Sequence, residues 1–163
     1  MQKKLLIIVP SVVAMAIVAV IAFSLIPAIK TTESETTLQY ETRKVTINNI
    51  PLTVEIADDN EKITKGLMFR EGMEEDRGML FIFEKEHGYQ FWMMNMKFNL
   101  DIIWLNANGK VVHIVENAEP CIDAAHSSQC TYNPDEPAKY VLEVNAGFVK
   151  KYGIDENSTM KFS

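Results

Sequence analysis

The chain has 163 residues, of which 16 are basic and 22 acidic, and its formal charge at pH 7 is −6. This length suits one domain with an appendage. The acidic balance argues against a nucleic-acid partner and against adhesion to anionic lipid headgroups. We therefore expect no nucleic acid among the partners.

The first 29 residues differ from the rest of the chain. Residues 5–29 are a run of 25 residues without a charge. As a helix this run would measure about 37 Å, against a hydrocarbon core of about 30 Å. Lys3 and Lys4 precede it and favour a cytoplasmic N-terminus.

We therefore expect a single-pass protein of the cell membrane with its C-terminal domain outside the cytoplasm. Its parts would be a cytoplasmic tip (1–4), a transmembrane signal anchor (5–29), a linker (30–44) and a β-rich extracytoplasmic domain (45–163). A cleaved signal peptide is the alternative, but such peptides usually have an apolar region of only ~7–15 residues. Either route exports the domain.

The two cysteines lie in a long polar loop at residues 119–139. Thiols outside the cytoplasm tend to pair, so we predict a disulfide between Cys121 and Cys130. The alternative is a zinc site with His126 and His113, but structural zinc sites usually have a tighter Cys-x₂₋₄-Cys spacing. We expect neither a metal nor a cofactor.

The remaining pattern is one of short β-type runs separated by turn signals. Residues 43–47 and 52–57 flank a turn at 48–51, and Asn108-Gly109 predicts a tight hairpin between 100–105 and 110–115. Further strands are expected at 79–83, 89–96, 140–145 and, as a last edge strand, 160–163. Short helices are expected after Asp58, ending near Gly66, and over 146–152, ending at Gly153. The pattern predicts a mainly β, single-domain sandwich or barrel with one or two short helices.

Five ordered blocks carry a family resemblance: 66–70 (GLMFR), 78–83 (GMLFIF), 91–95 (FWMMN), 100–105 (LDIIWL) and 140–147 (YVLEVNAG). Together they resemble the domain of unknown function 192 family over residues 45–162. The resemblance implies a compact, mostly β fold that is often exported in bacteria and archaea. It implies no established reaction.

Several polar residues lie within or beside apolar blocks, where burial costs free energy unless they are hydrogen-bonded. They are Arg70, Asn95, Asp101, Glu143 and Asn145. One interpretation is that they satisfy one another or cap turns. The other is a polar pocket lined by Arg70, Asn95, Asp101 and Glu143, in which the Arg70 guanidinium would bind a carboxylate or sugar hydroxyl and Trp92 would offer a stacking face.

Methionines at 93, 94 and 96 near His113 allow a copper hypothesis, but alternation along a strand places Met93 opposite the other two. Signatures of nucleophile elbows, zinc proteases and phosphate loops are missing from the sequence. We therefore expect a membrane-anchored binding or accessory module for a small polar ligand, a glycan or an envelope protein. The alternatives are a hydrolase or transferase using Asp101 or Glu143, and a structural or assembly factor.

Overall fold

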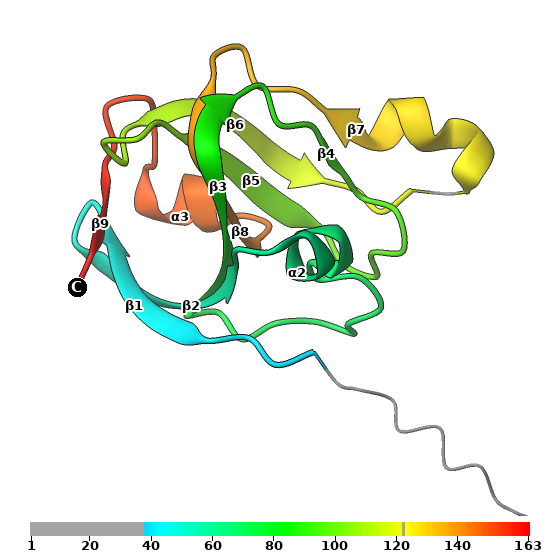
Figure 1. Ribbon diagram of the computed structural model, residues 1–163, viewed down its shortest axis with the longest axis horizontal. Helices are drawn as coiled ribbons and strands as arrows, with labels where there is room; N and C mark the ends of the chain where they lie inside the picture. The colour runs from blue at the N-terminus through cyan, green and yellow to red at the C-terminus, as the bar shows by residue number, and fades with distance from the viewer. Residues whose placement is uncertain (1–37, 122) are drawn as a thin grey trace, which may run out of the picture. The chain divides into compact units, whose positions relative to one another are not determined.

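The computed structural model describes residues 38–121 and 123–163 (Figure 1). The predicted tip, the anchor at 5–29 and most of the linker lie outside these residues. Among the helices of this described part, none has the length and apolar character that crossing a bilayer requires. The elements are β1 Thr42–Ile47, β2 Ile50–Ala57, α2 Asn60–Lys65, β3 Arg77–His87, β4 Phe91–Trp92, β5 Leu100–Leu105, β6 Val111–Ala118, the 3₁₀ helix η1 Ala124–Cys130, β7 Thr131–Tyr132, β8 Ala138–Asn145, α3 Phe148–Tyr152 and β9 Met160–Phe162.

Seven strands form one curled sheet in the order β6-β5-β8-β3-β2-β1-β9, and β4 pairs separately with β7. Strands β2 and β3 run parallel, whereas the other neighbours in the large sheet are antiparallel. Val111 of β6 and Met160 of β9 belong to the same buried cluster although they lie on opposite edges of the sheet. The sheet therefore curls into a half-barrel around that cluster. The barrel-like β prediction is confirmed, the sandwich alternative is not, and β9 is the predicted edge strand.

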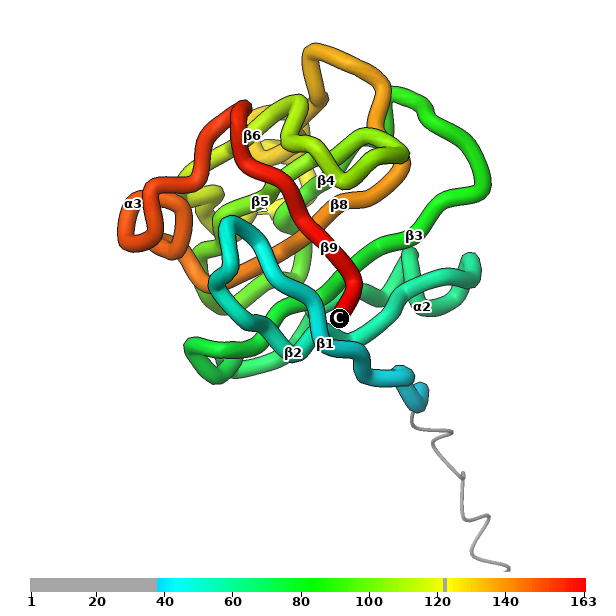
Figure 2. Tube along the Cα trace, turned by 90° about the vertical axis from the view of Figure 1, so that its left-hand side faces the viewer, coloured from blue at the N-terminus to red at the C-terminus, as the bar shows by residue number. Residues whose placement is uncertain are grey.

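The two edges of the sheet meet at the turn between β5 and β6. Lys110 forms an isolated bridge with Thr159, and the Met160 N–H donates to the Gly109 carbonyl at 2.8 Å, while β9 continues alongside β1 (Figure 2). Gly109 has a φ of +76°, and a Cβ at this position would lie 2.3 Å from the Met160 carbonyl oxygen. Glycine is therefore needed both for the turn and for the approach of the edges. The predicted Asn108-Gly109 hairpin is confirmed.

Two local predictions need correction. The first turn contains only Asn48 and Asn49, both with positive φ, because Ile50 already pairs with Ile47. The strand expected over 89–96 shortens to Phe91–Trp92, since the chain turns after Trp92 and Asn95 adopts a φ of +59°. The alternation of side chains assumed for residues 93–96 therefore does not hold.

The two predicted short helices are present. The N-cap of α2 lies one residue later than expected, because the Asp59 side chain, and not that of Asp58, accepts from the Lys62 N–H at 2.9 Å. It ends at Gly66. Helix α3 ends at Gly153, whose φ of +62° is the left-handed conformation predicted for its C-cap.

The apolar side chains divide into two cores on opposite faces of the large sheet. The inner core lies within the curl and is covered by α3. The outer core lies on the other face, beneath the β4 segment and the turn after α2. Members of the inner core include Val45, Val54, Leu80, Ile103, Leu142 and Phe148, and members of the outer core include Leu67, Met79, Phe81, Phe91, Ile102, Trp104 and Val141.

Candidate functional site

The two carboxyl groups singled out in the sequence lie on opposite faces of the sheet. Along β5, Asp101 follows Leu100 and precedes Ile102, both of which face the outer core, so Asp101 faces the inner core. Glu143 pairs with Ile102 and shares its face. These two residues therefore cannot form one pocket or act together as a catalytic pair.

Asp101 has a structural role in this fold. It is fully buried, and its Oδ1 accepts from the Asn117 N–H at 2.9 Å while its Oδ2 accepts from the Val149 N–H at 2.8 Å. The second bond satisfies a backbone donor in the first turn of α3, where such donors lack helical partners. Both oxygens are thus engaged, which fits the interpretation that buried polar residues satisfy their surroundings. The Asn145 side chain is also satisfied within the fold, because its Nδ2 donates to the carbonyls of Met73 and Glu74.

Arg70 forms a bidentate ion pair with Glu55 of β2. Its Nη1 and Nη2 donate to Glu55 Oε1 and Oε2, each at 2.7 Å, and the guanidinium carbon lies 5.4 Å from the centre of the Tyr40 ring. The hydrogen bonds from Arg70 lower the pKa of the Glu55 carboxyl and raise that of Arg70. The donor fork expected to bind a ligand is therefore occupied by a partner within the chain. Sequence reasoning missed Glu55, because it lies on a separate strand 15 residues before Arg70 and no local pattern links the two residues.

Glu143 lies in the outer core between Met79 of β3 and Ile102 of β5. Only 5% of the residue is exposed, and no group in residues 38–121 and 123–163 hydrogen-bonds to its carboxyl. Burial raises its pKa to about 8, and the positive charge of Arg70 offsets only part of that effect. This carboxyl is therefore protonated in most molecules at neutral pH.

The Glu143 side chain reaches a small cavity. Within the described residues, no fully buried side-chain oxygen or nitrogen lacks a hydrogen-bond partner, so the unpartnered Glu143 carboxyl must keep some accessible surface. Glu143 is one of the residues that line a cavity of about 30 Å³. We call it the Glu143 cleft; its walls are the end of α2 with the 66–68 turn on one side and Phe81, Phe91, Trp92 and Met96 on the other.

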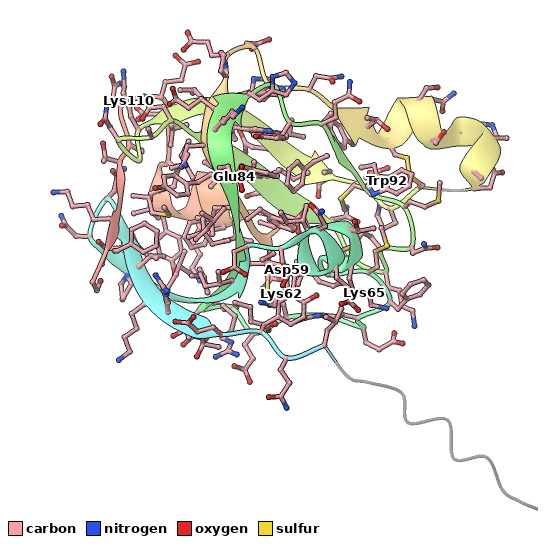
Figure 3. The ribbon with its side chains drawn as sticks, viewed as in Figure 1. Asp59, Lys62, Lys65, Glu84, Trp92 and Lys110 are labelled. Atoms are coloured by element: carbon pink, nitrogen blue, oxygen red, sulfur yellow. A yellow bond between two sulfur atoms is a disulfide. The ribbon has the colours of Figure 1, made fainter. Side chains whose placement is uncertain are left out.

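Trp92 forms the outer wall of the Glu143 cleft. Its side chain is 49% exposed, and Figure 3 shows it projecting from β4. Asn95 does not line the cleft but joins its two walls, because its carbonyl accepts from the Phe69 N–H at 2.9 Å. Asn95 and Phe69 both have positive φ values, +59° and +66°, which cost free energy in residues other than glycine. Of the predicted site residues, Trp92 and Glu143 thus meet in one cleft, with Arg70 and Asn95 beside it.

The predicted disulfide is confirmed, and it supports the Trp92 wall. Cys121 and Cys130 are bonded, with their Cα atoms 5.5 Å apart. The Met93 N–H donates to the Cys130 carbonyl and the Met93 carbonyl accepts from the Cys121 N–H, each at 3.0 Å. The disulfide loop therefore holds the backbone of the residue next to Trp92.

The zinc hypothesis loses two of its four ligands. Disulfide formation removes both thiolates from the zinc set, and Met93 is fully buried in the outer core. His113 Nδ1 lies 2.9 Å from Asp135 at the edge of a larger open hollow of about 580 Å³. In the part of the chain that the structure describes, no three His, Cys, Asp or Glu side chains are arranged to hold a metal ion.

Comparison with known proteins identifies a family and several solved structures that resemble this chain. The profile of the DUF192 family, described as "Uncharacterized ACR", matches residues 43–162, which confirms the resemblance found in the sequence. A crystal structure of a candidate transcription regulator from Sinorhizobium meliloti 1021 is 33% identical, has a TM-score of 0.69, and covers 77% of this chain and 96% of its own. A protein of unknown function from Novosphingobium aromaticivorans DSM 12444 is 28% identical, has a TM-score of 0.65, and covers 78% of this chain and 89% of its own. A search of curated proteins found no match.

Proposed function

The chain belongs to the DUF192 family, and we propose that its domain is a binding module for a small polar ligand, held outside the cytoplasm by the N-terminal anchor. The observation that carries this proposal is the Glu143 carboxyl, which has no hydrogen-bond partner among the described residues and belongs to a residue that lines a cleft together with three aromatic side chains. Binding sites in proteins are typically apolar hollows with a few polar groups that fix the ligand.

The surroundings of Glu143 favour a ligand over a purely structural role. An unsatisfied buried polar group costs roughly 1–3 kcal/mol, and Asp101 demonstrates how this chain satisfies a buried carboxylate when the role is structural. Glu143 has no such partner within the described residues, whereas a polar group entering past Trp92 could supply one. Perturbed titratable groups of this kind gather at functional sites.

The proposed location rests on the uncharged run at 5–29 and on the disulfide, which forms in oxidising compartments. Without Lys3 and Lys4 the chain has 14 basic and 22 acidic residues, a formal charge of −8. For this reason we do not extend the candidate role of the Sinorhizobium protein in transcription to this chain.

The catalytic alternative has less support. A hydrolase that uses two carboxyl groups needs them in one site, whereas Asp101 and Glu143 face opposite sides of the sheet. Glu143 is itself walled by apolar side chains, with no second carboxyl among the residues that line its cleft.

A ligand screen tests the proposal directly. Thermal unfolding of the wild-type protein and of Trp92→Ala would be measured against a panel of monosaccharides, amino acids, amines and short alcohols. We expect at least one compound class to raise the Tm of the wild type and to lose that effect in Trp92→Ala. If no compound discriminates the two proteins at millimolar concentration, the proposed function is wrong and an assembly role becomes the better account.

A further inference from the structure

Resting on the proposed function, we propose that the Glu143 cleft binds the primary ammonium group of a small organic amine, with the Glu143 carboxylate as its counter-ion. Three observations lead to this chemistry: the free carboxyl group of Glu143 beside a paired Arg70, the aromatic side chains that line the cleft, and the small volume of the cavity.

The pairing of Arg70 argues against the anionic ligand that an unpaired Arg70 would have favoured. Both terminal nitrogens of Arg70 donate to Glu55 at 2.7 Å, so its charge is neutralised within the chain. The group left without a partner in the described residues is the Glu143 carboxyl. A ligand can accept from the protonated carboxyl or donate to the ionised one, and a ligand with a positive charge gains most from the ionised form in a dry setting.

The aromatic side chains that line the Glu143 cleft are suited to binding a cation. Phe81, Phe91 and Trp92 line the cleft with aromatic rings, and the faces of such rings attract ammonium groups, most strongly when water is excluded. The cation among the lining residues is Lys65, and its Nζ lies 4.5 Å from the centre of the Phe69 ring, a residue that does not line the cleft. The Lys65 ammonium thus lies over the Phe69 ring, and the charge that acts on the Glu143 carboxyl is that of Arg70.

The size of the cavity selects the type of amine. A volume of about 30 Å³ accommodates one water-sized group. A primary ammonium is of this size, whereas a tetramethylammonium ion is several times larger. The alkyl part of the amine would extend outward along Trp92 and Met96, whose side chains are partly exposed.

The charged groups around Glu143 give the binding a defined pH dependence. Arg70, paired with Glu55, is the charge that acts on the carboxyl, and Lys65 at the end of α2 lines the same cleft. Because free Glu143 is protonated up to about pH 8, binding of an ammonium releases a proton. Apparent affinity should therefore rise about tenfold per pH unit well below pH 8, more slowly as pH 8 is approached, and level off above it.

The test is a fluorescence titration of the full chain with n-butylammonium, 1-butanol and tetramethylammonium. The chain has two tryptophans, and Trp104 is fully buried, so a change in quenching by an added solute reports on Trp92. Glu143→Gln keeps the shape of the side chain and removes its charge, and Glu156→Gln is the matched control at an exposed glutamate. We expect n-butylammonium to bind the wild type and Glu156→Gln alike, at least tenfold more weakly to Glu143→Gln, and more tightly than either other probe.

A second measurement keeps the test decisive if Glu143→Gln does not fold. In the wild type, ¹³C NMR of the glutamate side chains should show a carboxyl that titrates near pH 8 and moves to lower pH when n-butylammonium is added. Preferential binding of 1-butanol, or affinity that falls between pH 6 and 8, would overturn the ammonium assignment and leave the proposed function standing. Binding of none of the three probes would also overturn the assignment, and the ligand screen would then decide on the function separately.

Discussion

Replacing Glu143 with glutamine should make the stability of the protein less sensitive to pH. The carboxyl titrates at about 8 in the folded protein, against an ordinary value of 4.5. Between these two values the folded state holds a proton that the unfolded state has released, so stability falls as pH rises through this window. One pKa unit corresponds to about 1.4 kcal/mol, so wild-type stability should fall by about 3 kcal/mol between pH 4 and 7 through this group alone.

Other groups act in the opposite direction, which determines the design of the experiment. Hydrogen bonds lower the pKa values of the Glu55, Asp59 and Asp155 carboxyls, and stability from these groups is lost toward acid pH. Urea unfolding should therefore be measured from pH 4 to 8 for wild type, Glu143→Gln and the exposed control Glu156→Gln, and the differences compared. We expect the stability of Glu143→Gln relative to wild type to increase by about 3 kcal/mol between pH 4 and 7, with a flat difference for the control. A flat difference for Glu143→Gln as well would refute the claim that this carboxyl is buried without a partner.

Three further predictions concern the stability of the fold. Asp101→Ala leaves two backbone N–H groups without their acceptor and should lower the free energy of unfolding in urea by about 2–5 kcal/mol, without changing amine affinity in the fluorescence titration. Gly109→Ala places a methyl group 2.3 Å from the Met160 carbonyl oxygen at a positive φ and should cost at least about 2 kcal/mol, visible as a lower Tm; an unchanged Tm would mean that the sheet edges do not meet there. Reduction of the Cys121–Cys130 disulfide should cost ~2–3 kcal/mol in urea unfolding, and thiol labelling before reduction should find no free thiol.

The parts of the fold that could be predicted depend on local signals. The Asn108-Gly109 turn and the Gly153 cap each require a positive φ within a few residues, and both form as expected. The strand expected over 89–96 was too long because its end depends on a tertiary feature, the bonding of the Met93 backbone to the distant disulfide loop. An apolar composition alone does not contain that information.

The site could be predicted only in outline, for a similar reason. The sequence shows a carboxyl within an apolar strand at both Asp101 and Glu143. Whether each carboxyl is hydrogen-bonded depends on residues far away along the chain. Asp101 is satisfied by the N–H of Val149, at a separation of 48 residues. The Arg70–Glu55 pair has a separation of 15 residues and joins a loop to a strand. Only the folded arrangement reveals that the arginine is occupied and that Glu143 is not.

The cost of burying Glu143 and the proposed choice of ligand have one physical origin. Desolvation keeps the free carboxyl protonated at neutral pH, which weakens the fold relative to a neutral side chain. A neutral ligand leaves this desolvation penalty in place, because it carries no charge that would stabilise the ionised carboxylate. A primary ammonium offsets part of the penalty when it binds, since a nearby positive charge favours the ionised carboxyl. The pH slope of wild-type stability should therefore become shallower in n-butylammonium and stay unchanged in 1-butanol, so unfolding measurements and binding measurements must agree on the charge of the ligand.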